Sequence, residues 1–117
     1  MRFLTHTLSR GGGRDINQDA AEHSVAGEVA CWALADGLGG HGGGEEASRL
    51  ATESVMQAFR SHAECSPEAL MTYIEFARTA VNKRQDEQAM LSGMRTTLVV
   101  LVSDLRHALW AHVGDTR

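Results

Sequence analysis

Three aspartates stand where an apolar segment meets a glycine-rich or polar one, and carboxylates in such places are typical of metal sites. Asp36 follows the apolar segment 28–35 and precedes a run of glycines. Asp115 follows the apolar segment 107–113 after one glycine, and Asp19 ends a polar stretch. Carboxylate and carbonyl oxygens are the ligands that hard divalent cations prefer. The three positions together predict a cation site assembled from distant segments of the chain.

The glycine-rich segment 37–44 allows three interpretations. A lone Asp-Gly pair is most often a capped tight turn, whereas glycines on both sides of Leu38 would free backbone carbonyls to face a ligand. Residues 37–42 also match the dinucleotide pattern GxGxxG, but a second predicted helix follows where a βαβ unit needs a parallel strand. Glu45 stands where the lysine of a P-loop would follow the glycines. We therefore favour the cation site.

The spacing of apolar residues predicts the elements that must position these groups. Small residues from Ala47 to Phe59 recur at helical spacing and predict a helix after the glycines. Ser66 and Pro67 are typical of the start of a second helix, which should end near Gln88. Short apolar or alternating runs predict strands over residues 2–9, 20–26, 28–35, 97–102 and 107–113, with turns at Gly27 and at 103–106. Strands, two helices and strands in this order favour an α+β fold, with helices packed on an antiparallel or mixed sheet.

Composition excludes several classes of protein. A chain of 117 residues with 43% hydrophobic residues is typical of one small globular domain. The net charge of −4 gives no basic surface for nucleic acid, and the longest apolar run is too short to cross a membrane. The first residues lack a signal-peptide core, so we expect cytoplasmic localisation. Cys31 and Cys65 should be reduced thiols.

Four motifs in order resemble those of the PPM (type 2C) metal-dependent serine/threonine protein phosphatases, along essentially the whole chain. Arg14-x-x-Asn17-Gln18-Asp19 resembles the family's Arg-x-x-Asn-Glu-Asp, and residues 36–41 resemble its bacterial Asp-Gly-Met-Gly-Gly-His. Thr96-Thr97 is similar to its Gly-Thr-Thr, and residues 113–117 to its Val-Gly-Asp-Ser-Arg. The resemblance implies a β-sandwich flanked by helices in α-β-β-α layers. Residues 1–117 would then be the N-terminal portion of a single catalytic domain, incomplete in this chain.

The resemblance also implies two, or with a looser third site three, Mn²⁺ or Mg²⁺ ions held by named residues. Asp36 is similar to the aspartate that bridges two metals, and the carbonyl of Gly37 to a backbone ligand of the second metal. Asp19 and the residue before it resemble acids that hold metal-bound waters. Asp115 resembles a ligand of the third metal.

Two further residues are candidates for catalysis itself. Arg14 resembles the arginine that grips the substrate phosphate, which a planar guanidinium can do with two hydrogen bonds. Leu38 stands where many eukaryotic members have a histidine that is a proposed general acid. His41 could substitute for it, or it could be a solvated loop residue, and both interpretations stay open.

The activity implied is hydrolysis of phosphoserine and phosphothreonine in proteins by a metal-activated water, opposing a serine/threonine kinase. Gln18 replaces the usual Glu, so a non-catalytic pseudophosphatase that binds a partner is the alternative, although Arg14, Asp19, Asp36 and Asp115 are retained. Arg95 stands where the family usually has Gly. Because the family's later aspartates would lie beyond residue 117, we expect a cloned or proteolytic fragment that is inactive alone and binds metal weakly. We also expect the strand at 97–102 to lack a sheet neighbour and a dimer to cover the exposed sheet.

Overall fold

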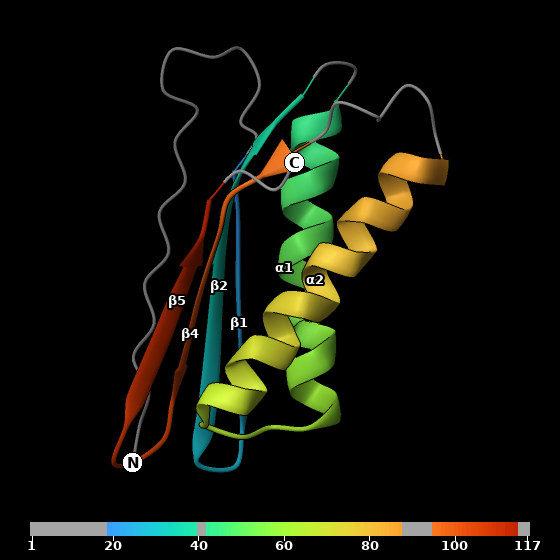
Figure 1. The fold of residues 1–117 in the computed structure, drawn as a ribbon. Helices are drawn as coiled ribbons and strands as arrows, with labels where there is room; N and C mark the ends of the chain where they lie inside the picture. The colour runs from blue at the N-terminus through green and yellow to red at the C-terminus, as the bar shows by residue number, and fades with distance from the viewer. Residues whose placement is uncertain (1–18, 40–41, 88–94, 115–117) are drawn as a thin grey trace.

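The computed structural model describes residues 19–39, 42–87 and 95–114. They form a five-stranded antiparallel sheet in which β1, β2, β4 and β5 lie side by side in that order, and the short β3 pairs with the end of β2. Two helices cover one face of this sheet (Figure 1). The elements in chain order are β1 (Asp19–Ala26), β2 (Val29–Leu38), α1 (Gly43–Ser61), α2 (Pro67–Glu87), β3 (Arg95–Thr96), β4 (Leu98–Ser103) and β5 (Ala108–Val113).

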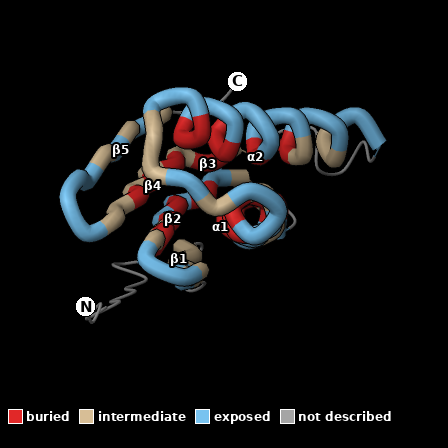
Figure 2. The backbone as a smooth tube through the Cα atoms, turned by 90° about the horizontal axis from the view of Figure 1, so that it is seen from below, coloured by how far each residue is buried: buried red, intermediate tan, exposed pale blue. Residues whose placement is uncertain are grey.

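The core lies between the sheet and the two helices, and the buried residues of β2 and of the first half of α1 are small. On β2, Cys31, Ala33 and Ala35 alternate with more exposed residues and point toward the helices. On α1, Ala47 and Ala51 are completely or almost completely buried. Small side chains let a helix approach a sheet closely, so α1 contacts both β1 and β2. Figure 2 shows buried residues gathered where the helices face the sheet.

The second helix packs mainly on α1 and is tied to the core by one aromatic residue. The rings of Phe59 and Tyr73 meet edge to face, with centroids 5.8 Å apart. The hydroxyl of Tyr73 donates a hydrogen bond to the carbonyl of His62 and accepts one from the backbone N–H of Glu64. The connection between the helices is therefore fixed by a buried side chain of the helix that follows it.

Local sequence signals set the helix start and the turns. The hydroxyl of Ser66 accepts a hydrogen bond from the N–H of Ala69 at 3.1 Å, which is the N-cap predicted for α2. Gly27 turns β1 into β2 with a φ of +62°, a conformation that favours glycine. Between β4 and β5 the carboxylate of Asp104 accepts hydrogen bonds from the N–H groups of Arg106 and His107. Both hairpin connections fall where the sequence predicted them.

The α+β prediction is confirmed, and so is the sheet with helices packed on it. The glycine segment joins β2 to α1. Because β2 and β4 are antiparallel, this segment does not belong to a βαβ unit. The prediction that the strand at 97–102 lacks a neighbour is wrong, since β4 pairs with β2 on one side and with β5 on the other. The predicted strand at 2–9 lies outside the described residues. None of the described helices is long and apolar enough to cross a membrane.

Candidate metal centre

The register of the first hairpin places two of the predicted acids directly opposite each other. Asp19 is the first residue of β1 and the cross-strand partner of Asp36 on β2. The sequence predicted that β2 would end at residue 35, but the strand continues to Leu38 and includes Asp36. Since Asp36 alternates with the buried Ala35 and Gly37, its side chain points to the face of the sheet away from the helices. Cross-strand partners share a face, so the carboxylate of Asp19 points the same way.

The backbone hydrogen bonds of Asp36 show that Asp19 and Asp36 form the closer of the two kinds of antiparallel residue pair. The carbonyl of Asp36 accepts a hydrogen bond from the N–H of Thr97 at 3.0 Å, and its N–H donates to the Thr97 hydroxyl at 3.2 Å. Both backbone groups of Asp36 are thus directed toward Thr97 and away from β1. Asp19 and Asp36 therefore form a non-hydrogen-bonded pair, in which the Cα atoms lie about 4.5 Å apart and the side chains are at their closest.

Like charges directly opposite each other on a sheet are destabilising, whereas a cation between two carboxylates reverses the sign of the interaction. The donor set consists of hard oxygens, which Mg²⁺ and Mn²⁺ prefer. Asp36 is exposed and Asp19 half-buried, so a hydrated ion could reach both. This chemistry fits the metal that the resemblance implies.

The two threonines of the third motif hold Asp36 in place. The hydroxyl of Thr96 lies 3.2 Å from the Asp36 carbonyl, and Thr96 itself is buried. Thr97 contributes both its N–H and its hydroxyl to the same residue. The sequence identified these threonines as a motif but assigned them no role. In the structure they lie beside Asp36 and position its backbone.

Gly37 brings the end of β2 against the start of α1. A Cβ atom at this position would lie 1.7 Å from the carbonyl oxygen of Gly44, which no real side chain could tolerate. Only glycine therefore allows the strand and the first turn of the helix to touch. The metal role predicted for the Gly37 carbonyl stays a prediction, but the residue clearly sets the distance between these two elements.

An ion-pair cluster fixes the same turn of α1 to the second helix. Glu46 accepts hydrogen bonds from Arg49 on its own helix and from Arg84 on α2, the latter at 3.1 Å. A carboxylate in the first turn also suits the helix dipole. Sequence analysis missed Arg84, because no pattern along the chain reveals that it lies against a residue 38 positions earlier.

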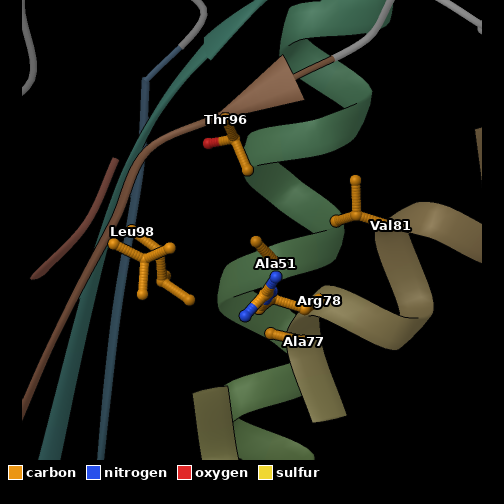
Figure 3. Close-up of a pocket in the computed structure, with 7 residues that line it drawn as sticks. Ala51, Ala77, Arg78, Val81, Thr96 and Leu98 are labelled. Atoms are coloured by element: carbon orange, nitrogen blue, oxygen red, sulfur yellow. The ribbon is translucent and has the colours of Figure 1, made fainter. Parts of the chain in front are cut away.

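A small cavity lies near the threonines on the helix side of the sheet (Figure 3). It holds about 10 Å³, roughly the space of one water, and its exposed lining is apolar. The lining residues come from both helices and three strands: Ala51, Ala77, Arg78, Val81, Thr96, Leu98 and Val113. The cavity is on the opposite face of the sheet from Asp36, so it is a packing defect of the core and not part of the candidate metal centre.

The structure brings together only part of the predicted site. Asp19, Asp36 and Gly37 lie at one end of the sheet, while Arg14, His41 and Asp115 lie outside the described residues. Within the described ranges no group of three or more His, Cys, Asp or Glu side chains could hold a metal ion. Asp19 and Asp36 are thus the two predicted acids that the described part of the chain places side by side.

Comparisons with known proteins identify the family of the chain. The family model described as "Protein phosphatase 2C" matches residues 10–117. The chain belongs to this family. It is 33% identical over 89 residues to "Serine/threonine phosphatase stp" of Listeria monocytogenes, covering 72% of this chain and 35% of that protein. It is 34% identical over 110 residues to "Protein phosphatase PhpP" of Streptococcus pneumoniae, covering 89% of this chain and 44% of that protein.

Its fold matches a solved bacterial phosphatase of the same type. The serine/threonine phosphatase PstP/Ppp of Mycobacterium tuberculosis superimposes with a TM-score of 0.65 at 30% identity, covering 86% of this chain and 42% of that one. The chain therefore spans less than half the length of each of these relatives. The fold and the family are shared.

Proposed function

We propose that the complete protein is a metal-dependent phosphatase that hydrolyses phosphoserine and phosphothreonine in proteins. The observation that carries the proposal is the close pair of Asp19 and Asp36, held at one end of the sheet by Thr96 and Thr97. Family membership supports the reaction class, and the named relatives are serine/threonine phosphatases. The chain as a whole would then be the N-terminal portion of one catalytic domain.

Each predicted site residue would have a distinct role in this reaction. Asp36 and Asp19 would hold divalent cations, and the carbonyl of Gly37 and the carboxylate of Asp115 would add ligands. The guanidinium of Arg14 would donate hydrogen bonds to two phosphate oxygens at once. It would thereby orient the phosphorus for attack by water opposite the leaving oxygen. A divalent cation, when bound, supplies a water of lowered pKa and neutralises phosphoryl charge. His41 would be placed to donate a proton to the leaving oxygen, provided that it approaches the phosphate.

Metal dependence is tested in the complete protein with a phosphothreonine peptide. Turnover should require Mn²⁺ or Mg²⁺, stop with EDTA, and survive alkylation of the thiols, because the donor set contains only oxygens. Asp36→Asn should abolish Mn²⁺ binding measured by calorimetry, whereas Arg14→Ala should weaken phosphate binding and leave the metal bound. Glu53→Gln, an exposed carboxylate on α1, is the control. Full activity in EDTA would contradict the proposal.

The alternative function, a pseudophosphatase that only binds a partner, is favoured by Gln18 in place of the usual acid. It gives a different outcome in the same assay: Mn²⁺ would bind with the same Asp36 dependence, but no phosphate would be released. For the 117-residue chain alone we propose weak Mn²⁺ binding and no turnover, because the described residues provide only two neighbouring carboxylates.

The same resemblance also supports a proposal for the cellular compartment and the kinase that the enzyme opposes. We propose that it works in the cytoplasm and removes phosphate groups added by a serine/threonine kinase. Both cysteines are free thiols, which is typical of proteins in a reducing compartment. Dephosphorylation of the kinase by the complete phosphatase, followed with phosphorylation-specific staining, would test the pairing.

A further inference from the structure

Arg95 lies at the same end of the sheet as the candidate metal centre and on the same face. It is the first residue of β3 and the cross-strand partner of Leu38, two residues beyond Asp36 on β2. The residue that follows it, Thr96, is buried and lines the cavity on the helix side of the sheet (Figure 3). Since side chains alternate along a strand, Arg95 points to the opposite face, away from the helices. This is the face to which Asp36 points.

The register also brings Arg95 close to the acidic pair. Thr97 is hydrogen-bonded to the backbone of Asp36, so Arg95, two residues before Thr97, is the diagonal neighbour of Asp36. Diagonal neighbours on one face of a sheet lie about 8 Å apart, which is within reach of a long side chain. Asp19 is on the other side of Asp36, one strand further away. The guanidinium of Arg95 therefore belongs beside the acidic pair, on the side away from Asp19.

The charge of Arg95 has no counter-ion in the part of the chain that the structure describes. No carboxylate there forms an ion pair with it, whereas Arg49 and Arg84, near the first turn of α1, both pair with Glu46. Arg95 is half-buried, and its cross-strand partner Leu38 is 48% exposed. An arginine can rest its apolar stem on such a neighbour and keep its charged end in water. Leu38 and Arg95 thus present an apolar surface and a positive charge together, next to the candidate metal centre.

The position of Arg95 suits a group beside the phosphorylated residue of a substrate. With a phosphate held at the candidate metal centre, the neighbouring substrate residues come within reach of Leu38 and Arg95. Consecutive residues of an extended peptide are about 3.3 Å apart, so a side chain one or two positions from the phosphorylated residue can meet a guanidinium that starts about 8 Å from Asp36. A carboxylate at that place can accept two hydrogen bonds from an arginine, whereas a basic side chain would be repelled.

We propose that Arg95 and Leu38 form a substrate subsite that binds an acidic side chain, Asp or Glu, within two residues of the phosphorylated one. Arg95 determines specificity there and takes no part in the reaction itself. The family usually has glycine at this position, which offers no side chain, so the charge is a feature of this chain. The inference rests on the proposed function, because it places the substrate phosphate at the candidate metal centre.

The test uses the complete protein with Mn²⁺ and matched phosphothreonine peptides that carry either glutamate or glutamine at the flanking positions. The value of kcat/KM should be about three- to tenfold higher for the glutamate peptides, as expected for one partly exposed charged contact, and added salt should reduce the difference. Arg95→Gln should remove this preference. Arg95→Lys should keep part of it, because an ammonium retains the charge but not the planar pair of donors. Hydrolysis of para-nitrophenyl phosphate, which has no flanking residues, should be the same for all three proteins.

Arg106→Gln is the matched control, because Arg106 is an exposed arginine in the turn between β4 and β5, at the opposite end of the sheet. It should prefer the glutamate peptides as strongly as the unaltered protein does. An unaltered protein without any preference overturns the proposal, and so does a preference that Arg95→Gln leaves unchanged. An equal loss for every substrate, the small ester included, overturns it too, since Arg95 would then bind the phosphate itself or support the fold.

Failure of the proposed function gives a separate result. A protein that hydrolyses none of these substrates contradicts the proposed function, but fluorescence anisotropy of the labelled peptides still measures their binding. Tighter binding of the glutamate peptides, lost in Arg95→Gln and kept in Arg106→Gln, would then support the subsite without the reaction. Equal binding of both kinds of peptide, or binding of neither, would overturn the subsite as well.

Discussion

Replacing Gly37 by alanine should destabilise the chain strongly, because there is no room for the added methyl group. The new Cβ would lie 1.7 Å from the Gly44 carbonyl oxygen and 2.4 Å from its carbon. Ordinary contacts between such atoms need about 3.5 Å, so the end of β2 and the first turn of α1 must separate by about 1.8 Å. Both partners are backbone, and neither can rotate away as a side chain would.

The expected loss is about 3 kcal/mol or more, the upper part of the range for overpacked sites. The whole chain should have a stability of roughly 6 to 18 kcal/mol, so this is a substantial fraction of it. Urea unfolding followed by circular dichroism measures the loss, and the Tm should fall by about 10 to 20 °C. The dependence of the unfolding free energy on urea concentration should stay unchanged if the native state remains compact.

Gly114→Ala is the control, because a Cβ at that position meets nothing within 4 Å. Its unfolding free energy should stay within about 0.5 kcal/mol of the unaltered chain, as for an ordinary surface substitution. If Gly37→Ala were as stable as Gly114→Ala, the close approach of β2 to α1 would be wrong. Gly37 would then not be the residue that places the candidate metal centre beside α1.

Three other predictions concern groups outside the metal centre. Tyr73→Phe should lose about 1 kcal/mol in urea unfolding, because the His62 carbonyl and a backbone N–H lose their partner; an unchanged midpoint would contradict this. Hydrogen bonds from the N–H groups of Arg106 and His107 lower the pKa of Asp104, so its stabilisation is present above the unfolded value of 3.8 and is lost as the pH falls below it. The stability difference caused by Asp104→Ala should therefore be measurable at pH 7 and shrink toward pH 3, and a constant difference would refute it. Burial raises the pKa of the Cys31 thiol to about 12, so iodoacetamide at pH 8 should modify Cys31 only in urea, and rapid labelling of the folded chain would count against the buried position.

The elements that sequence analysis predicted well are those fixed by local signals. The second helix begins at Pro67, after the Ser66 cap, and ends at Glu87, one residue before the predicted end. The first helix buries Ala47, Ala51, Val55 and Phe59, the face that its spacing predicted. For α2 the period of apolar residues and the Ser66 cap agree, and for α1 the period alone indicates the buried face. Tertiary contacts therefore did not override the local preferences.

The end of β2 was predicted less well, for a physical reason. Asp36 and Gly37 have low strand propensity and favour a turn. In the structure Gly37 pairs with Thr96, and Leu38 with Arg95, on a strand nearly sixty residues away. This long-range pairing outweighs the local preference, and no local window of sequence contains that information. The same reason explains the wrong prediction for the strand at 97–102, whose neighbours lie on β2 and β5.

The described residues of the four motifs lie near one another because antiparallel strands alternate in direction. Asp19 starts β1 and lies opposite Asp36 near the end of β2, and Asp36 is bonded to Thr97 just before β4. Leu98 on β4 pairs with Val113 on β5, so the next residue along, Gly114, comes beside Thr97. The start of β1, the end of β2, the start of β4 and the end of β5 therefore lie at the same end of the sheet. Motifs separated by up to about a hundred residues along the chain therefore reach one row through register alone, before any metal is bound. Shifting the register of β1 by one residue would turn Asp19 to the helix side and separate it from Asp36. The hairpin at Gly27, which sets that register, is therefore as important for the candidate site as its predicted ligands are.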